Sequence, residues 1–383
     1  MEKRFKVMTV FGTRPEAIKM APVVKALERQ ESIDCCVVLT AQHREMLDQV
    51  VDLFQIKASY DLNLMKHGQT LSSLTARVIE GIDPILAEEK PDLVLVQGDT
   101  STTFVAALAA FYHRIPVGHI EAGLRTGKKY SPWPEEINRK LTTGLADLHF
   151  APTTLAKDNL LREGISPEKI YVTGNTVIDA LLATVKKEYE FADQNLSKIL
   201  NANSDKRLIL LTTHRRENLG EPMRQIYQAL AQILAEHSDT YVIFPMHKNP
   251  AVRSVVAEVL GKEQRIHLIE PLDYEPFVNL LARADLILTD SGGIQEEAPS
   301  LGKPVLCVRD TTERPEAVAA GTVLLVGTEY QRVYASLTKL LTDRQIYQKM
   351  AQTANPYGDG LASLRIADIV IDYLENSKNK NIY

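Results

Sequence analysis

Short runs of almost wholly apolar residues alternate with longer amphipathic stretches along this chain, and that alternation limits the possible folds more than any other feature. A strand that is apolar along its whole length is buried on both faces, which is typical of a parallel sheet covered by helices. The runs occur in two series and predict an α/β protein with two doubly wound, Rossmann-like domains facing a central cleft. They are Phe5–Phe11, Ile33–Leu39, Asp92–Gln97, Pro116–Ile120, Leu148–Ala151, Arg207–Thr213, Tyr241–Met246, Arg265–Ile269, Asp285–Thr289, Pro304–Val308 and Thr322–Val326. The helical period is clearest in Pro15–Gln30, Leu71–Glu89 and Glu221–Glu236.

Two polar segments suggest where the domains meet. The length of 383 residues fits two domains. The stretch between Glu188 and Arg207 is polar and precedes the second series of strands, and Asn355–Gly360 precedes a predicted last helix over Leu361–Glu375. We expect one domain of residues 1–180 plus 361–383 and another of residues 181–360. Ligands of such sheets bind beyond the carboxyl ends of the strands, so the cleft between the domains is the expected site.

The composition excludes several classes of protein. A net charge of −5 argues against a broad nucleic-acid surface or a polybasic membrane patch. The longest uncharged stretch, Thr100–His113, is shorter than the ~20 residues that span a bilayer, and the N-terminus lacks the apolar core of a signal peptide. The three cysteines, Cys35, Cys36 and Cys307, suit neither a disulfide framework nor a metal site. We therefore expect a soluble cytoplasmic protein.

The segment Gly12–Lys19, GTRPEAIK, follows the first predicted strand and suggests an anion site. Gly12 permits a tight turn and Pro15 suits a first helical turn. Arg14 and Lys19 would then lie beside free backbone N–H groups at the helix N-terminus. The alternative is a solvated first turn. The segment is not a nucleotide-binding P-loop, because no GKS or GKT occurs in the chain.

Two strand ends in the second half favour a diphosphate and a ribose. Ser291 and Gly292 follow a strand and open a helix, where N–H groups can face a phosphate. Glu296 can accept ribose hydroxyls or simply oppose the helix dipole. His214 begins the cationic sequence HRREN after another strand, which is either a diphosphate site or a solvated loop. No GxGxxG motif follows a first strand, so we expect no nicotinamide cofactor.

Three carboxylates follow strands or open helices in the first half. Asp99, Glu121 and Glu135 would converge at one sheet edge as acid–base groups. Asp99 is alternatively a helix N-cap and Glu135 a first-turn acid, whereas Glu121 extends a strand that should be buried. His119 shares a strand face with Glu121, but no third ligand follows at helical spacing, so we expect no metal.

Together these motifs resemble the bacterial non-hydrolysing UDP-N-acetylglucosamine 2-epimerases over nearly the whole chain. The motifs are FGTRPEAIKMAP, TAQHREMLDQV, GDTSTTF, HIEAGLRTG, SPWPEEINR, TGNTVIDAL, HRREN, LTDSGGIQEEAPSLGKPVL, RDTTERPEAV and NPYGDG. The resemblance implies a fold like that of GT-B glycosyltransferases, with the last helix returning to the first domain. It also implies a homodimer, no cofactor, and interconversion of UDP-GlcNAc and UDP-ManNAc by elimination and re-addition of UDP through 2-acetamidoglucal. The product would supply ManNAc for surface polysaccharide.

The resemblance also assigns residues. UDP is expected against Arg14, His214, Ser291, Gly292 and Glu296, with Phe277 near the uracil. The implied catalytic residues are Lys19, Asp99, Glu121, Glu135 and His214.

A second, regulatory substrate site is implied as well, with Gln42, His43 and Gln69 as its candidates. Gly68 stands where the family has an arginine before that glutamine, so we expect weaker or absent activation by UDP-GlcNAc. Gln97 stands where a His is common, and Thr213 where a Gly is common.

Four alternatives stay open at this stage. Related enzymes hydrolyse the same intermediate, a GT-B glycosyltransferase would need an acceptor site, and close relatives act on UDP-hexuronates modified at C6. A UDP-sugar sensor on this fold should lack the carboxylates, yet Asp99, Glu121 and Glu135 are all present.

Overall fold

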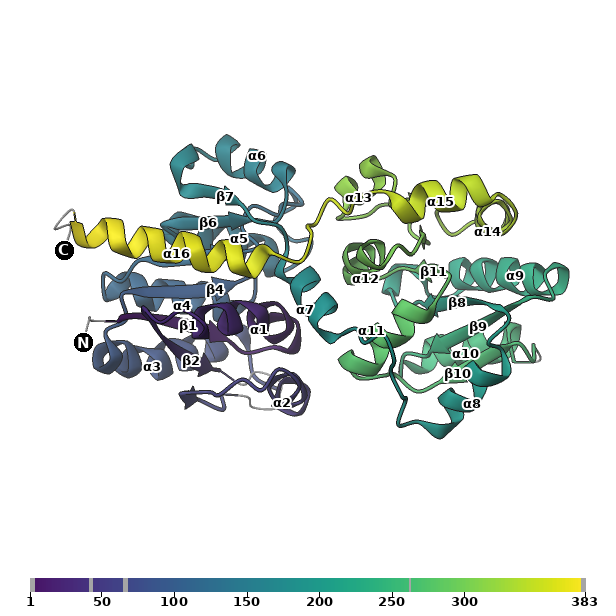
Figure 1. Cartoon of the computed structure of the whole chain (residues 1–383), viewed down its shortest axis with the longest axis horizontal. Coiled ribbons are helices and arrows are strands. Elements are labelled where there is room, and N and C mark those ends of the chain that lie inside the picture. Colours follow the sequence, from purple (N-terminus) through teal and green to yellow (C-terminus); the bar gives the residue numbers. More distant parts are fainter. Residues whose placement is uncertain (1–3, 41–43, 65–67, 262, 380–383) are drawn as a thin grey trace. The chain divides into compact units, whose positions relative to one another are not determined.

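The chain forms two compact α/β units in a computed structural model that describes residues 4–40, 44–64, 68–261 and 263–379. The first unit comprises Met1–Leu182 together with Tyr357–Tyr383, and the second comprises Ala183–Pro356 (Figure 1). Each unit has a parallel sheet with helices on its two faces. The predicted fold class, two doubly wound Rossmann-like domains, is confirmed.

The first unit contains a seven-stranded sheet in the order β3-β2-β1-β4-β5-β6-β7. Its strands are β1 (Phe5–Phe11), β2 (Ile33–Leu39), β3 (Tyr60–Asp61), β4 (Leu93–Gln97), β5 (Val117–Ile120), β6 (Leu148–Ala151) and β7 (Ile170–Val172). Its α-helices are α1 (Arg14–Glu28), α2 (Arg44–Leu53), α3 (Leu71–Glu89), α4 (Ser101–Tyr112), α5 (Glu135–Leu145), α6 (Thr154–Arg162), α7 (Thr176–Thr184, which ends in the second unit) and α16 (Ala362–Asn379).

The second unit repeats this plan with a six-stranded sheet in the order β10-β9-β8-β11-β12-β13. Its strands are β8 (Arg207–Thr212), β9 (Thr240–Pro245), β10 (Ile266–Ile269), β11 (Leu286–Thr289), β12 (Val305–Cys307) and β13 (Val323–Leu325). Its α-helices are α8 (Gln194–Ala202), α9 (Glu221–Glu236), α10 (Pro250–Val259), α11 (Tyr274–Arg283), α12 (Gly292–Glu297), α13 (Pro315–Ala320), α14 (Tyr330–Thr342) and α15 (Arg344–Gln352).

The strand order of each sheet reverses direction at one place. In the first unit the chain runs outward from β1 to β3, then returns to β4 on the other side of β1. In the second unit β8 and β11 hold the same two positions. The connections leave in opposite directions at these pairs, and ligands of doubly wound sheets bind at such switch points. The residues after β1 and β4, and after β8 and β11, are therefore the ones to examine for function.

Burial explains which strands the sequence predicts. β4, β5, β6 and β11 are buried at every position, as continuous apolar runs require. Strands β3 and β7, the two outer strands of the first sheet, were not predicted from the sequence. They have two and three residues and are partly exposed, so neither leaves an apolar run to detect.

The polar segment after Glu188 does not separate the units. It lies inside the second unit and contains α8, whose N-terminus is capped by Asp193 through bonds from two backbone N–H groups. Leu196 and Leu200 bury the apolar side of this helix. The chain passes between the units at Leu182 instead, where α7 is still helical and no polar composition marks the change.

The C-terminal segment belongs to the first unit, where α16 packs against α1 (Figure 1). Asp179 on α7 accepts hydrogen bonds from the backbone N of Ala362, at 3.2 Å, and of Ser363, at 2.7 Å, and thereby caps the start of α16. Burial raises the pKa of Asp179, and these donors oppose that rise.

None of the helices in the described part of the chain is both long and apolar enough to cross a membrane.

Two glycines beyond β5 test how tightly this edge of the first sheet is packed. Both have a positive φ, +89° at Gly123 and +72° at Gly127. A Cβ on Gly123 would lie 2.2 Å from the carbonyl oxygen of Ala156, whereas one on Gly127 would meet nothing within 4 Å. We expect Gly127→Ala to lower the free energy of unfolding by about 1 kcal/mol through backbone strain alone. Gly123→Ala should cost about 1–3 kcal/mol more, because α6 must move. Urea denaturation of both variants measures the difference, and equal losses would contradict this packing.

Candidate active site

The N-terminus of α1, at the switch point of the first sheet, is closed by the chain itself. Glu16 Oε2 accepts hydrogen bonds from the backbone N of Gly12, at 3.1 Å, and of Thr13, at 2.7 Å. Glu16 Oε1 accepts from Thr100 Oγ1 at 2.6 Å and Thr103 Oγ1 at 3.2 Å. Burial raises the pKa of Glu16, and these donors oppose the rise. The expectation of free N–H groups here is wrong, because a buried carboxylate already occupies them.

Gly12 and Arg14 lie beside this N-cap and have different roles. A Cβ on Gly12 would lie 1.8 Å from Thr40 Oγ1, so glycine is required by close approach. Arg14 is half-buried and has no ion pair among the residues that the structure describes. Its guanidinium is therefore available to an anion.

Glu121 follows β5 in a strained conformation. Its φ is +65°, in the left-handed region that non-glycine residues rarely adopt, and it is only 8% exposed. Its Oε2 accepts hydrogen bonds from the ammonium of Lys19 on α1 and from Gln97 Nε2 at 3.2 Å. Glu121 therefore does not extend the strand as predicted, and Lys19 is neutralised by a carboxylate of the same unit.

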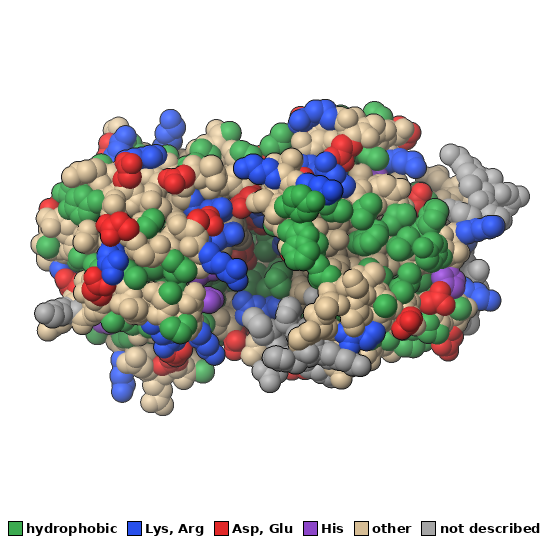
Figure 2. Space-filling model, turned by 180° about the vertical axis from the view of Figure 1, so that it is seen from behind, with side chains coloured by type: hydrophobic (Ala, Val, Ile, Leu, Met, Phe, Trp, Pro, Cys, Tyr) green, Lys and Arg blue, Asp and Glu red, His purple; other side chains and the backbone are tan. Residues whose placement is uncertain are grey.

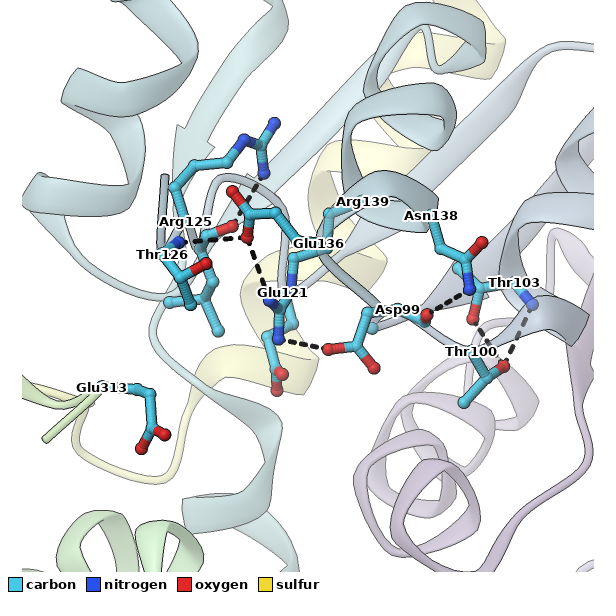
Figure 3. A network of polar contacts seen from close by, with 12 residues as sticks. Asp99, Thr100, Thr103, Glu121, Arg125, Thr126, Glu136, Asn138, Arg139 and Glu313 are labelled. Carbon is cyan, nitrogen blue, oxygen red and sulfur yellow. Dashed lines mark hydrogen bonds and ion pairs between the residues drawn. The ribbon is translucent and has the colours of Figure 1, made fainter. Parts of the chain in front are cut away.

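Asp99 lies at the end of β4 and pairs with Arg139 of α5 (Figure 3). Asn138 Nδ2 donates to the backbone oxygen of Asp99 at 2.9 Å. The N-cap of α4 is Thr100, whose Oγ1 accepts from Thr103 N at 3.2 Å, so the N-cap interpretation of Asp99 is wrong. The side chain of Asp99 is held by a cation and kept at the sheet edge.

The two glutamates that open α5 differ in their surroundings. Glu136 is buried and accepts from the backbone N of Thr126 and of Gly127, each at 3.0 Å, so it anchors the preceding loop (Figure 3). Arg139 reaches Glu136 at 3.5 Å as well as Asp99. Glu135 is half-buried, and its side chain makes no hydrogen bond or ion pair within the described ranges. Of the two, Glu135 is the one whose carboxylate is not committed to the fold.

His119 on β5 contacts the backbone at the end of β4, next to Asp99. Its Nε2 lies 2.7 Å from the backbone oxygen of Gly98, the residue before Asp99, whose φ is +76°. Burial lowers the pKa of His119 to about 3, so the ring is neutral and donates from Nε2. Among the described residues, no three His, Cys, Asp or Glu side chains are grouped to hold a metal ion.

The switch point of the second sheet is organised by Asp290, which follows β11. Asp290 is fully buried. Its carboxylate accepts from the backbone N of His214, at 2.9 Å to Oδ2, from the backbone N of Arg215 at 2.9 Å, and from Asn218 Nδ2 at 3.2 Å. The HRREN segment is thus tied to the end of β11, although Arg216 and Glu217 within it are exposed.

Two guanidinium groups meet over the start of α12. The Cβ direction of Gly292 points toward Arg215 Nη2 at 3.8 Å and Arg314 Cζ at 3.9 Å. Arg314 also pairs with Glu296, which is 1% exposed. Two cations this close favour an anion between them. Arg215 belongs to the cationic HRREN sequence that was predicted to bind a diphosphate, whereas Arg314, in the motif RDTTERPEAV, was not proposed as a ligand.

Three other predicted site residues have few described contacts. Ser291 is the N-cap of α12, and its backbone N donates to Thr289 Oγ1 at 2.9 Å. Phe277 is half-buried on α11. Gln69 accepts a hydrogen bond from Arg77, so a guanidinium lies beside it although position 68 is glycine. Gln42 and His43 lie outside the described residues.

His214 carries the titratable group of the second switch point. Its ring stacks on His247 with centroids 5.6 Å apart, and its Nδ1 lies 3.2 Å from Asp290 Oδ1. Burial lowers the pKa of His214, whereas the negative charge of Asp290 raises it.

The titration of His214 tests this arrangement. We expect its NMR midpoint to lie below that of an ordinary histidine. It should fall further in Asp290→Asn, because the charge that favours the imidazolium is removed while burial remains. His267 on β10 serves as an internal control, and a rise of the His214 midpoint in the variant would contradict the assignment.

This chain is similar to known proteins of one family over most of its length. The family model described as UDP-N-acetylglucosamine 2-epimerase matches residues 25–371. A Bacillus subtilis protein of that name is 56% identical over 366 residues, which cover 96% of this chain and 95% of the relative. An Escherichia coli protein of the same name is 56% identical over 382 residues, covering 98% and 99%.

Solved structures agree with this match. A UDP-GlcNAc 2-epimerase from Neisseria meningitidis bound to UDP-GlcNAc has a TM-score of 0.85 at 52% identity, covering 96% of this chain and 100% of that one. The Staphylococcus aureus protein MnaA in complex with UDP has a TM-score of 0.87 at 51% identity, covering 97% of each chain. The chain belongs to the UDP-N-acetylglucosamine 2-epimerase family.

Proposed function

We propose that this protein interconverts UDP-N-acetylglucosamine and UDP-N-acetylmannosamine by reversible epimerisation at C2, without net hydrolysis. The observation that carries the proposal is Glu121, a buried and conformationally strained carboxylate paired with Lys19 at the switch point of the first sheet. Strained residues of this kind occur mainly at functional sites. Relatives of the same family have been solved with UDP-GlcNAc and with UDP, which supports the substrate class.

The proposed chemistry begins with departure of UDP, because the C2 proton of the sugar is not next to a carbonyl and is weakly acidic. The C1–O bond breaks, and UDP leaves with the electron pair. A base removes the C2 proton, and the double bond of 2-acetamidoglucal forms between C1 and C2. Return of a proton to the opposite face of C2 and re-addition of UDP to C1 give the epimer.

The second unit would bind the nucleotide. Arg215 and Arg314, which meet over Gly292, supply charge for the diphosphate, and His214 lies at the same strand end. Glu296 would accept the ribose hydroxyls, and its pairing with Arg314 fixes its orientation. Arg14, Ser291 and Phe277 complete the proposed UDP contacts, with Phe277 beside the uracil.

The first unit would move the protons. Asp99, Glu121 and Glu135 are the candidates, and each differs in its partners: Arg139 for Asp99, Lys19 for Glu121, and no described partner for Glu135. Since Lys19 contacts Glu121, we assign it to that carboxylate and leave the diphosphate to the arginines. The presence of these acids favours an enzyme over a UDP-sugar sensor.

A homodimer that supplies ManNAc for surface polysaccharide completes the proposal. The first unit exposes apolar side chains on the face that lies behind its sheet in Figure 1 and is turned toward the viewer in Figure 2. Phe111 at 57% and Tyr112 at 62% exposure stand at the end of α4, and Leu141 is exposed on α5, which packs beside α4. Such a patch supports association of two copies.

Weaker activation by UDP-GlcNAc, expected from Gly68, stays a prediction.

The elimination scheme is tested by turnover in D₂O. Removal and return of the C2 proton must place solvent deuterium at C2 in both sugars, and NMR of the equilibrated mixture measures it. A hydrolysing relative would instead accumulate ManNAc and free UDP. Epimerisation with protium fully retained at C2 would contradict elimination and indicate hydride transfer.

Glu121→Gln removes the acid–base group and keeps the size of the side chain. We expect turnover to fall by roughly 10²–10⁴-fold while UDP affinity changes little. Glu163→Gln is the matched control, because it also removes a paired carboxylate of the first unit, the partner of Arg125. Equal activity of the Glu121 variant and the control would exclude Glu121 from catalysis.

Glu296→Ala tests the ribose assignment by calorimetry with UDP. The variant loses an acceptor and frees Arg314, so binding should weaken by about 1–3 kcal/mol. Glu275→Ala, which removes a half-buried acid paired with Lys186 in the same unit, should leave UDP affinity unchanged. Unaltered affinity in Glu296→Ala would remove this residue from the nucleotide site.

A further inference from the structure

Gln97 is placed against Glu121 by the central strands of the first sheet. It is the last residue of β4, is 2% exposed, and stands opposite Ile120 of β5 in the parallel register. Its Nε2 donates to Glu121 Oε2 at 3.2 Å. The amide therefore reaches Glu121 from a rigid position, next to the residue whose φ is +65°.

The backbone of Gln97 does not explain this contact. Its carbonyl oxygen accepts from Thr103 Oγ1 at 2.6 Å, so the main chain has a partner of its own. The side chain of a buried glutamine needs hydrogen bonds, and here its amide nitrogen turns to a carboxylate that Lys19 already contacts. Two donors on one oxygen fix the carboxyl group more firmly than one.

The two donors differ in what they can do when Glu121 gains a proton. The Lys19 ammonium has three donors and no acceptor, so it can donate to either form of the carboxyl group but cannot accept the O–H of the acid. An amide has both a donor and an acceptor end, so it can donate to a carboxylate and accept from a carboxylic acid after rotation. A group that exchanges protons needs a partner that holds it in both states.

We propose that Gln97 is a positioning residue that keeps the Glu121 carboxyl group in place in both of its protonation states. The inference rests on the proposed function, in which Glu121 transfers protons at C2. A neutral imidazole also has one donor and one acceptor, so histidine should serve at this position, whereas leucine should not.

The variants Gln97→Leu and Gln97→His, with Asn203→Leu as control, test this in the full-length protein. Asn203 is a buried amide of the second unit that donates to a backbone carbonyl and accepts from Lys206, so its loss reports the cost of removing a buried amide elsewhere in the protein. In Gln97→Leu we expect kcat to fall by about 10–100-fold with KM little changed. The acidic limb of its pH–rate profile should move to higher pH, because the carboxylate loses a donor. Gln97→His should regain most of kcat and the original profile.

A second readout does not depend on turnover. In protein labelled with ¹³C at the glutamate carboxyl carbon, the Glu121 resonance is identified by its loss in Glu121→Gln and titrated in each variant. Its midpoint should rise in Gln97→Leu and stay in place in Asn203→Leu. Wild-type protein without epimerase activity would refute the proposed function, whereas the midpoint still tests the role of Gln97. An unchanged midpoint, or a pH–rate profile of Gln97→Leu that superimposes on that of wild type, would overturn the inference.

Discussion

Buried carboxylates that accept backbone and side-chain donors hold both switch points in place. Glu16 closes the N-terminus of α1 and ties it to the start of α4 through Thr100 and Thr103. Asp290 holds the HRREN segment on the end of β11. An ionised carboxylate is costly to bury unless its oxygens are satisfied, so each of these groups requires a specific local backbone. These two anchors fix the segments that carry Arg14 in the first unit and His214 and Arg215 in the second.

Two of the candidate catalytic carboxylates in the first unit are paired with cations. Glu121 is paired with Lys19 and Gln97, and Asp99 is paired with Arg139. In the second unit Arg215 and Arg314 lie over the start of α12, with Arg314 paired with Glu296 and Arg215 held beside Asp290. This division suits a reaction in which a diphosphate leaves with negative charge and carboxylates move a proton.

Periodicity and strand ends allowed much of this to be predicted from the sequence. Buried strands such as β1 and β2 were predicted at their observed bounds, because continuous apolar runs have few other uses. The outer strands β3 and β7 left no such signal. The role of Glu16 was overlooked although Thr13 and Glu16 form a capping box, a pattern that is local in the sequence. That Lys19 faces Glu121 could not be predicted, because these side chains are far apart in the chain. Residues at strand ends can be proposed from spacing, but their partners come from tertiary packing.

The central claim is that UDP leaves C1 and returns during each cycle, and positional isotope exchange tests it most directly. UDP-GlcNAc carrying ¹⁸O only in the bridge between C1 and the β-phosphorus is incubated with the enzyme, and ³¹P NMR follows the label. Free rotation of the bound β-phosphate should move the ¹⁸O into non-bridging positions in both substrate and product. An ¹⁸O label that stays in the bridge while the C2 epimer accumulates would contradict cleavage of the C1–O bond and with it this account.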